Sequence, residues 1–126
     1  MVKKEYVSWE QVEDFVREVA EEYKDKGITG IFGLPRGGLC MAVMLSNKMN
    51  LPMLLAPADN CLIVDDIADS GRSLIHYTEN DTQFNKYDIV TLFYDERSIV
   101  KPNLYRYKKN GRWIVFPWEM EEVEQE

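Results

Sequence analysis

The sequence has few cysteines, no long apolar run and no excess of positive charge. Its two cysteines, Cys40 and Cys61, lie in apolar stretches, so we expect buried, reduced thiols and a cytoplasmic protein. No run approaches the roughly 18 apolar residues that span a membrane, and residues 1–6 lack the apolar core of a secretory signal. The net charge of −7 argues against a nucleic-acid-binding surface, which would be basic. We therefore expect neither a membrane nor a nucleic acid as a partner.

The composition is that of one globular domain. Hydrophobic residues make up 45% of the 126 positions and charged residues 29%, which suffices for a single core. We assign residues 1–126 to one domain, in which the five glutamates of 119–126 form a solvated acidic tail. Charges more than about 8 Å away are largely screened. An acidic protein can therefore still bind phosphate through backbone N–H groups, arginines and a metal ion.

Helical patterns alternate with short apolar runs along the chain. A capping box at Ser8–Gln11 predicts the start of a helix that ends near Gly27. We expect further helices near 40–45 and 72–78, an irregular stretch at 95–112, and strands at 28–33, 53–56, 61–64, 87–94 and 113–117. This alternation predicts an α/β fold with a mostly parallel sheet flanked by helices.

The segment Cys61–Ser73 joins an apolar strand, two acids, a small-residue loop and a helix. Ligands of parallel sheets bind beyond the carboxyl ends of the strands, where we expect Asp65 and Asp66. The backbone N–H groups of Ala68–Ser73 can converge on an anion, helped by two serine hydroxyls. The two carboxylates suit ribose hydroxyls or a Mg²⁺ ion held partly by substrate phosphates. A sugar phosphate with a further pyrophosphate would satisfy both the pair of acids and the small-residue loop. The alternative interpretation is that the acids only cap the strand and the loop is only a turn.

This segment resembles the signature by which type I phosphoribosyltransferases bind 5-phosphoribosyl-1-pyrophosphate (PRPP), and the resemblance extends over most of the chain. It implies that Asp65 and Asp66 contact the ribose hydroxyls and that the loop cradles the 5′-phosphate. It also implies that Asp69 acts as the general base at the purine N7. The loop residues implied in PRPP binding are Ala68, Asp69, Ser70, Gly71, Arg72 and Ser73.

The turn Gly33–Gly38 also follows an expected strand and precedes an expected helix. Its glycines permit close backbone approach, and Arg36 can bind phosphate oxygens in a bidentate manner. Such a turn is more often only a turn, but its position resembles the pyrophosphate loop of the family. The resemblance places Arg36 and Gly37 on PRPP and implies a strained peptide between Pro35 and Arg36.

The C-terminal segment Trp113–Glu119 resembles the base-binding segment of the xanthine–guanine branch of the family. The resemblance implies that Trp113 stacks on the purine and that the backbone of Ile114 contacts the edge of the base. It also places Glu119 where family members can have an acid near the metal. The alternative is a closing core strand whose tryptophans only pack. Residues 108–112 are typical of a hairpin turn, whose positive charge would help to steer PRPP.

Two features depart from the family pattern. Members that accept 6-oxopurines usually carry a lysine after the strand that here ends at Tyr94, whereas this chain has Asp95. Asp95 would favour an amino group if it reached the base, and Arg97 or Lys101 would restore recognition of a carbonyl if the loop folds back. The identity of the base is therefore open. The family also has a long lid hairpin where this chain has only residues 53–60. Without a lid to exclude water, we expect leakier chemistry, a cover from another subunit or loss of catalysis.

The sequence thus predicts a Mg²⁺-dependent purine phosphoribosyltransferase, commonly a homodimer or homotetramer in this family. It would convert PRPP and a purine base to a nucleoside monophosphate and pyrophosphate. Asp65 and Asp66 would hold the ribose and the metal, and Asp69 would take the proton of the base. Two alternatives stay open. One is a non-catalytic PRPP or nucleotide sensor, and the other, less favoured, is a phosphohydrolase with Asp65 as nucleophile.

Overall fold

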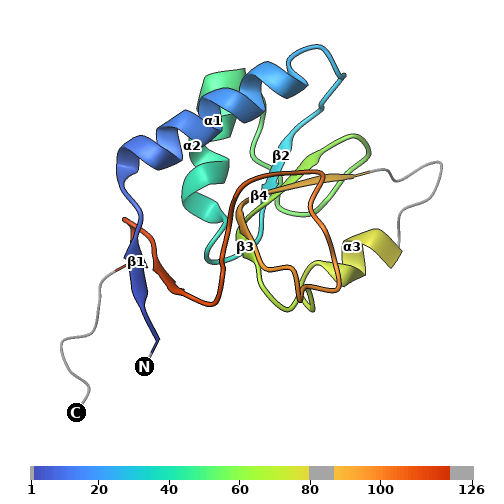
Figure 1. The fold of residues 1–126 in the computed structure, drawn as a ribbon. Coiled ribbons are helices and arrows are strands. Elements are labelled where there is room, and N and C mark those ends of the chain that lie inside the picture. The colour runs from blue at the N-terminus through green and yellow to red at the C-terminus, as the bar shows by residue number, and fades with distance from the viewer. Residues whose placement is uncertain (1, 80–86, 120–126) are drawn as a thin grey trace.

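The computed structural model describes residues 2–79 and 87–119, and within these a four-stranded parallel sheet forms the centre of the fold (Figure 1). Its strand order is β2–β3–β4–β5, with bounds Ile31–Gly33, Leu62–Ala68, Asp88–Tyr94 and Leu104–Lys108. A smaller parallel sheet pairs β1 (Lys4–Tyr6) with β6 (Trp113–Val115). Apart from Glu119, the acidic tail expected at the C-terminus lies outside the described residues.

Helices cover both faces of the main sheet. The helices α1 (Trp9–Tyr23) and α2 (Leu39–Met49) pack together on one face, and the short α3 (Ile75–Glu79) lies on the other (Figure 1). The predicted capping box starts α1, since Ser8 Oγ accepts a hydrogen bond from the Gln11 N–H at 3.1 Å. No helix in the described residues is long and apolar enough to cross a bilayer. The predicted α/β fold with a parallel, helix-flanked sheet is confirmed.

The apolar run of β3 fills the core on both sides of the sheet. Successive side chains of a strand point to opposite faces. Leu62 and Val64 accordingly pack in the cluster beneath α1 and α2, whereas Ile63 packs in the cluster beneath α3. All three side chains are fully buried. A continuous apolar run rather than an alternating one is therefore the pattern this central strand requires.

Two expected boundaries were wrong because pairing between strands overrides local composition. β3 does not end at Val64 but continues to Ala68, since Asp65 pairs with Thr91 and Ala68 with Tyr94 of β4. Both acids therefore lie within the strand rather than after it. The stretch 95–112 is not irregular throughout, because β5 pairs with β4 as an edge strand. Its sequence, Leu-Tyr-Arg-Tyr-Lys, contains no continuous apolar run, and its side chains are half-buried or exposed, so the sequence did not reveal it.

The strand expected at 53–56 and the hairpin expected at 108–112 were also wrong, whereas the lid hairpin is missing from its region, as expected. Residues 53–56 form no strand; Met53 makes only an isolated bridge with Ile31. The turn at 108–112 is not a hairpin, because β5 pairs with β4 and β6 pairs with β1. The region 50–61, which the structure describes completely, contains no lid hairpin.

Candidate active site

The turn before α2 packs directly against the carboxylate end of β3. A Cβ atom at Gly37 would lie 2.2 Å from Asp66 Oδ2, and one at Gly38 would lie 2.1 Å from the Val64 carbonyl oxygen. The neighbour of Gly38 is backbone, so that position requires glycine, whereas a side chain at Gly37 would displace the Asp66 carboxylate. The two glycine-containing segments that the sequence singled out therefore meet at Asp66.

Arg36 stands at the exposed outer side of this turn. The peptide that joins Pro35 to Arg36 is cis, so the unusual peptide expected before the arginine is present. The Leu34 N–H donates to the Val64 carbonyl at 2.9 Å, which ties the start of the turn to β3. Arg36 is thereby placed in solvent, next to the segment that holds Asp65 and Asp66.

Asp65 and Asp66 are half-buried neighbours in β3. Burial, together with the charge of Asp66, raises the pKa of Asp65 to about 8. Burial also raises the pKa of Asp66. The backbone N–H of Asp66 donates to Asp65 Oδ1 at 2.9 Å. Two adjacent carboxylates that are costly to ionise would gain from a bound cation or from hydroxyl donors.

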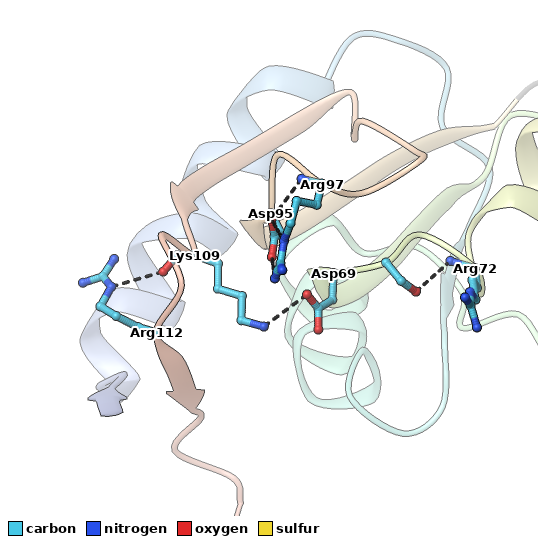
Figure 2. Close-up of polar contacts among 7 residues, drawn as sticks. Asp69, Arg72, Asp95, Arg97, Lys109 and Arg112 are labelled. Atoms are coloured by element: carbon cyan, nitrogen blue, oxygen red, sulfur yellow. Dashed lines mark hydrogen bonds and ion pairs between the residues drawn. The ribbon is translucent and has the colours of Figure 1, made fainter. Parts of the chain in front are cut away.

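The loop that follows β3 reverses direction at Gly71, whose φ is +84°. A Cβ atom at Gly71 would lie 2.6 Å from Ser98 Oγ and 2.8 Å from the Val100 nitrogen, so the loop rests closely on the segment after β4. The Arg72 N–H donates to Ser70 Oγ at 3.3 Å (Figure 2). The side chains on the outer side of the loop are exposed: Asp69, Ser70, Arg72 and Ser73.

A cavity of about 160 Å³ lies between this loop and β6. The β3 side contributes Asp66, Ile67 and Asp69. The C-terminal side contributes Lys109, Trp113, Ile114, Phe116 and Glu119. The structure thus brings three predicted groups around one space: the ribose-binding carboxylate of Asp66, the general base and the base-binding residues. The cavity lining does not include Arg36, Asp65, Ser70, Arg72 or Ser73.

Trp113 and Ile114 present different groups at this cavity. Trp113 is 61% exposed, so its indole is not packed into the core. The Trp113 N–H donates to the Lys3 carbonyl at 2.8 Å, and the Val7 N–H donates to the Val115 carbonyl at 2.9 Å. Backbone polar groups alternate between the two edges of a strand. Those of Ile114 therefore face away from β1.

The other C-terminal tryptophan has a structural role. Trp118 stacks on Phe116 with ring centroids 5.1 Å apart, and it also contacts Trp9. The interpretation of this segment as purely core-forming thus fits Trp118 but not Trp113. Glu119 Oε1 accepts from the Phe116 N–H at 3.0 Å, and the charge of Glu119 contributes to the raised pKa of Asp66.

Lys109 lines the cavity, whereas the sequence indicated it only as part of the basic turn 108–112, with no role at the base. Its Nζ lies 3.1 Å from Asp69 Oδ1, and its side chain is 18% exposed (Figure 2). The neighbouring Lys108 points outward and pairs with Glu96 at 2.7 Å. A prediction of β5 from the sequence would have shown that Lys108 and Lys109 differ, because adjacent residues at the end of a strand point to opposite sides.

Asp95 does not reach the cavity. Its carboxylate accepts from Arg97 at 2.8 Å from Nη2 and 3.2 Å from Nε, and from the Arg97 backbone N–H at 2.9 Å (Figure 2). These hydrogen bonds lower the pKa of Asp95 to about 2. Among the described residues that line the cavity, none comes from 95–101. The contacts considered for Asp95, Arg97 and Lys101 with the base are therefore absent from this arrangement.

No protein-family model matches the chain, and no curated protein sequence matches it. Among solved structures it is similar to the purine phosphoribosyltransferase of Pyrococcus horikoshii Ot3, with TM-score 0.83 and 28% identity over 98% of this chain and 99% of that one. It is also similar to the Helicobacter pylori xanthine-guanine-hypoxanthine phosphoribosyltransferase, with TM-score 0.79 and 20% identity over 94% and 93%. A hypothetical protein from Neisseria gonorrhoeae with bound ppGpp gives TM-score 0.67 and 17% identity over 98% and 93%.

The structural neighbours of this chain include several type I phosphoribosyltransferases, among them purine enzymes matched along nearly their whole length. The resemblance inferred from the PRPP-type segment is thereby confirmed. The 126-residue length is close to that of the Pyrococcus protein, since the match covers 99% of that chain.

Proposed function

We propose that this protein is a purine phosphoribosyltransferase, which joins the 5-phosphoribosyl group of PRPP to a purine and releases pyrophosphate. The observation that carries the proposal is the single cavity lined by Asp66 and Asp69 on one side and by Trp113 and Ile114 on the other. A sugar phosphate and a flat base that react with each other need adjoining sites of these two kinds. The similarity to a purine phosphoribosyltransferase at 28% identity supports the same function.

PRPP would lie along the carboxyl end of β3. Asp65 and Asp66 would bind the ribose hydroxyls, and the loop 68–73 would bind the 5′-phosphate through backbone N–H groups. Arg36 and Gly37 would bind the pyrophosphate, which the contact of Gly37 with Asp66 brings beside the ribose. The exposed guanidinium of Arg36 suits a charged oxygen pair.

Mg²⁺ fits this site as an ion shared between protein and substrate. No group of three or more His, Cys, Asp or Glu side chains that could hold a metal occurs in the described residues. Asp65 and Asp66 supply two carboxylates, and Mg²⁺ is commonly held by one or two carboxylates together with substrate phosphates. When bound with PRPP, the ion would neutralise charge on the departing pyrophosphate.

The chain's own residues would act on the base and on the ribose. The bond between C1′ and the purine nitrogen forms as the bond between C1′ and the pyrophosphate oxygen breaks. Once another ring nitrogen of the purine has bonded to C1′, Asp69 would accept the proton that N7 loses, which leaves the base neutral. Carboxylates near C1′ would stabilise the positive charge that develops there. Trp113 would stack on the purine and hold its ring in the direction of attack.

The second candidate function is a PRPP or nucleotide sensor without turnover. The absence of a lid hairpin in the fully described region 50–61 favours it, because water would reach the reacting carbon. The similarity to a Neisseria protein that binds ppGpp is compatible with it at the level of the fold.

The experiment that separates the candidates is incubation of the protein with PRPP and Mg²⁺, with and without each of several purine bases. We expect pyrophosphate release that depends on a purine. Binding of PRPP without release on any base would reject the enzyme and support the sensor. Release of inorganic phosphate from simple phosphate monoesters would instead support the phosphohydrolase.

A further inference from the structure

We propose that Lys109 determines which base the protein accepts, and that it selects purines with a carbonyl oxygen at position 6. This inference rests on the proposed function and narrows it from purines in general to 6-oxopurines. The residue that recognises the purine O6 would then lie in the turn between β5 and β6. The position after β4 holds Asp95, which does not line the cavity.

Lys109 is held so that its ammonium group lies in the cavity. Its backbone N–H donates to the Tyr94 carbonyl at 2.9 Å, and its carbonyl accepts from Arg112 Nε at 3.2 Å (Figure 2). Arg112 also forms an ion pair with Glu5 of β1. The Lys109 side chain is 18% exposed and its Nζ lies 3.1 Å from Asp69 Oδ1. The turn therefore fixes a mostly buried cation beside the proposed general base.

Lys109 and Asp69 present one donor and one acceptor side by side. A lysine ammonium can only donate a hydrogen bond, and an ionised carboxylate can only accept one. A 6-oxopurine with its proton on N7 offers the complementary pattern, because O6 and N7 are neighbours on one edge of the base. Its O6 would accept from Lys109 while its N7–H donates to Asp69.

Adenine lacks this complementarity. Its amino group at position 6 would place a donor against the Lys109 ammonium and leave a polar group without a partner. Lys109 is the sole cation among the described residues that line the cavity, so no other lining side chain offers a cationic donor to O6. The base that fits this pair is therefore hypoxanthine, guanine or xanthine.

The test compares kcat/KM for hypoxanthine, guanine and adenine in the wild type and in Lys109→Met, at saturating PRPP and Mg²⁺. Methionine keeps the length of the side chain and removes the donor. We expect the wild type to prefer the 6-oxopurines, and Lys109→Met to lower their kcat/KM by about 5-fold to 150-fold. The value for adenine should stay the same or rise, and Lys109→Arg should retain a preference for 6-oxopurines.

Lys108→Met is the matched control, because it removes the same charge from the adjacent residue, which pairs with Glu96 outside the cavity. It should leave the ratio between bases unchanged. A wild-type preference for adenine would overturn the proposal. An equal fall for all three bases in Lys109→Met, or the same change of ratio in Lys108→Met, would also overturn it. Where Lys109→Met does not fold, Lys109→Gln replaces it with the same expectation.

Binding of nucleoside monophosphates distinguishes failure of this inference from failure of the proposed function. If the wild type turns over no base, the enzyme proposal fails, but calorimetric titration with the inosine, guanosine and adenosine monophosphates still tests Lys109. We expect the first two to bind more tightly than the third, and Lys109→Met to abolish the difference. Equal affinities in the wild type would reject the role of Lys109.

Discussion

Asp69 lies at the edge of the cavity with its side chain 53% exposed and its carboxylate beside Lys109. Its position allows it to take a proton from a base that is stacked on Trp113. The backbone of the surrounding loop, rather than the Asp69 side chain, would bind the 5′-phosphate. The residue should therefore matter to turnover much more than to PRPP affinity.

Asp69→Asn keeps the shape of the side chain and removes its ability to accept the proton. We expect kcat to fall by about 10²-fold to 10⁴-fold, with little change in the dissociation constant for PRPP. Steady-state kinetics and calorimetric titration of PRPP measure the two quantities. Glu96→Gln, an acid outside the cavity, is the control. Equal losses of turnover and affinity would remove Asp69 from proton transfer.

Asp95, unlike Asp69, has a structural role. Its carboxylate is nearly buried, with the side chain 9% exposed, and it holds Arg97 at the start of the segment that supports Gly71. Hydrogen bonds from Arg97 lower its pKa from 3.8 to about 2. A carboxylate with a lowered pKa in the folded state adds stability above the unfolded pKa. That contribution is lost as the pH falls through the folded value.

Asp95→Asn should lower the free energy of unfolding by about 1 kcal/mol at pH 7, the usual difference between charged and neutral hydrogen bonds. The exposed Arg97 side chain, which solvent screens, keeps this value small. Urea denaturation at pH 7, 4 and 2.5 measures it. The difference between wild type and variant should be complete above about pH 4 and smaller at pH 2.5. A difference that does not change with pH would exclude the Asp95 charge as its cause.

The sequence identified most single residues of the site but not all of them. Asp66, Asp69, Trp113 and Ile114 stand in short motifs whose spacing is local, and the structure brings them together around one cavity. Lys109 belongs to no such motif. Its place in the cavity depends on the pairing of β5 with β4, which joins segments that the chain pattern does not link.

The loop after β3 and the segment after β4 form one supporting unit. Gly71 contacts Ser98 and Val100, and the Ile99 N–H donates to the Ser70 carbonyl at 2.9 Å. These contacts fix the backbone that would surround the 5′-phosphate. A side chain at Gly71 should therefore disturb both stability and PRPP binding.

Gly71→Ala and Gly111→Ala form a matched pair, because their φ values are +84° and +73°. Each substitution should lower the free energy of unfolding by about 1–2 kcal/mol, because alanine is strained in the left-handed backbone conformation. Only Gly71→Ala also collides with neighbours, since the space around Gly111 is open. We expect the free energy of unfolding of Gly71→Ala to be lower by a further ~1–3 kcal/mol. Its PRPP binding should also be weaker. Equal destabilisation of the two variants in urea would contradict close packing at Gly71.

Elements with a strong local signal were predictable, and those defined by partners were not. The capping box and the apolar spacing specify α1, and the β-branched and aromatic run specifies β4. By contrast, the extension of β3 to Ala68 depends on its ladder with β4. β5 is a polar edge strand that only its parallel partner reveals.

At the scale of the whole molecule, the described residues place no lid hairpin over the site. The chain reaches β3 from α2 through the short connection 50–61, without a hairpin to cover the cavity. The family resemblance predicted both the fold and this departure from it. The oligomeric state stays a prediction, and a neighbouring subunit of a homodimer or homotetramer would be one source of cover.

The most direct test of the proposed function is to quantify nucleoside monophosphate and pyrophosphate formed from PRPP, Mg²⁺ and a 6-oxopurine in the same reaction. We predict both products in a ratio close to one, with little pyrophosphate when the base is omitted. Water that enters the site would add pyrophosphate without nucleotide, and the omitted-base reaction measures that part. Tight binding of PRPP with no nucleoside monophosphate from any purine would contradict transfer.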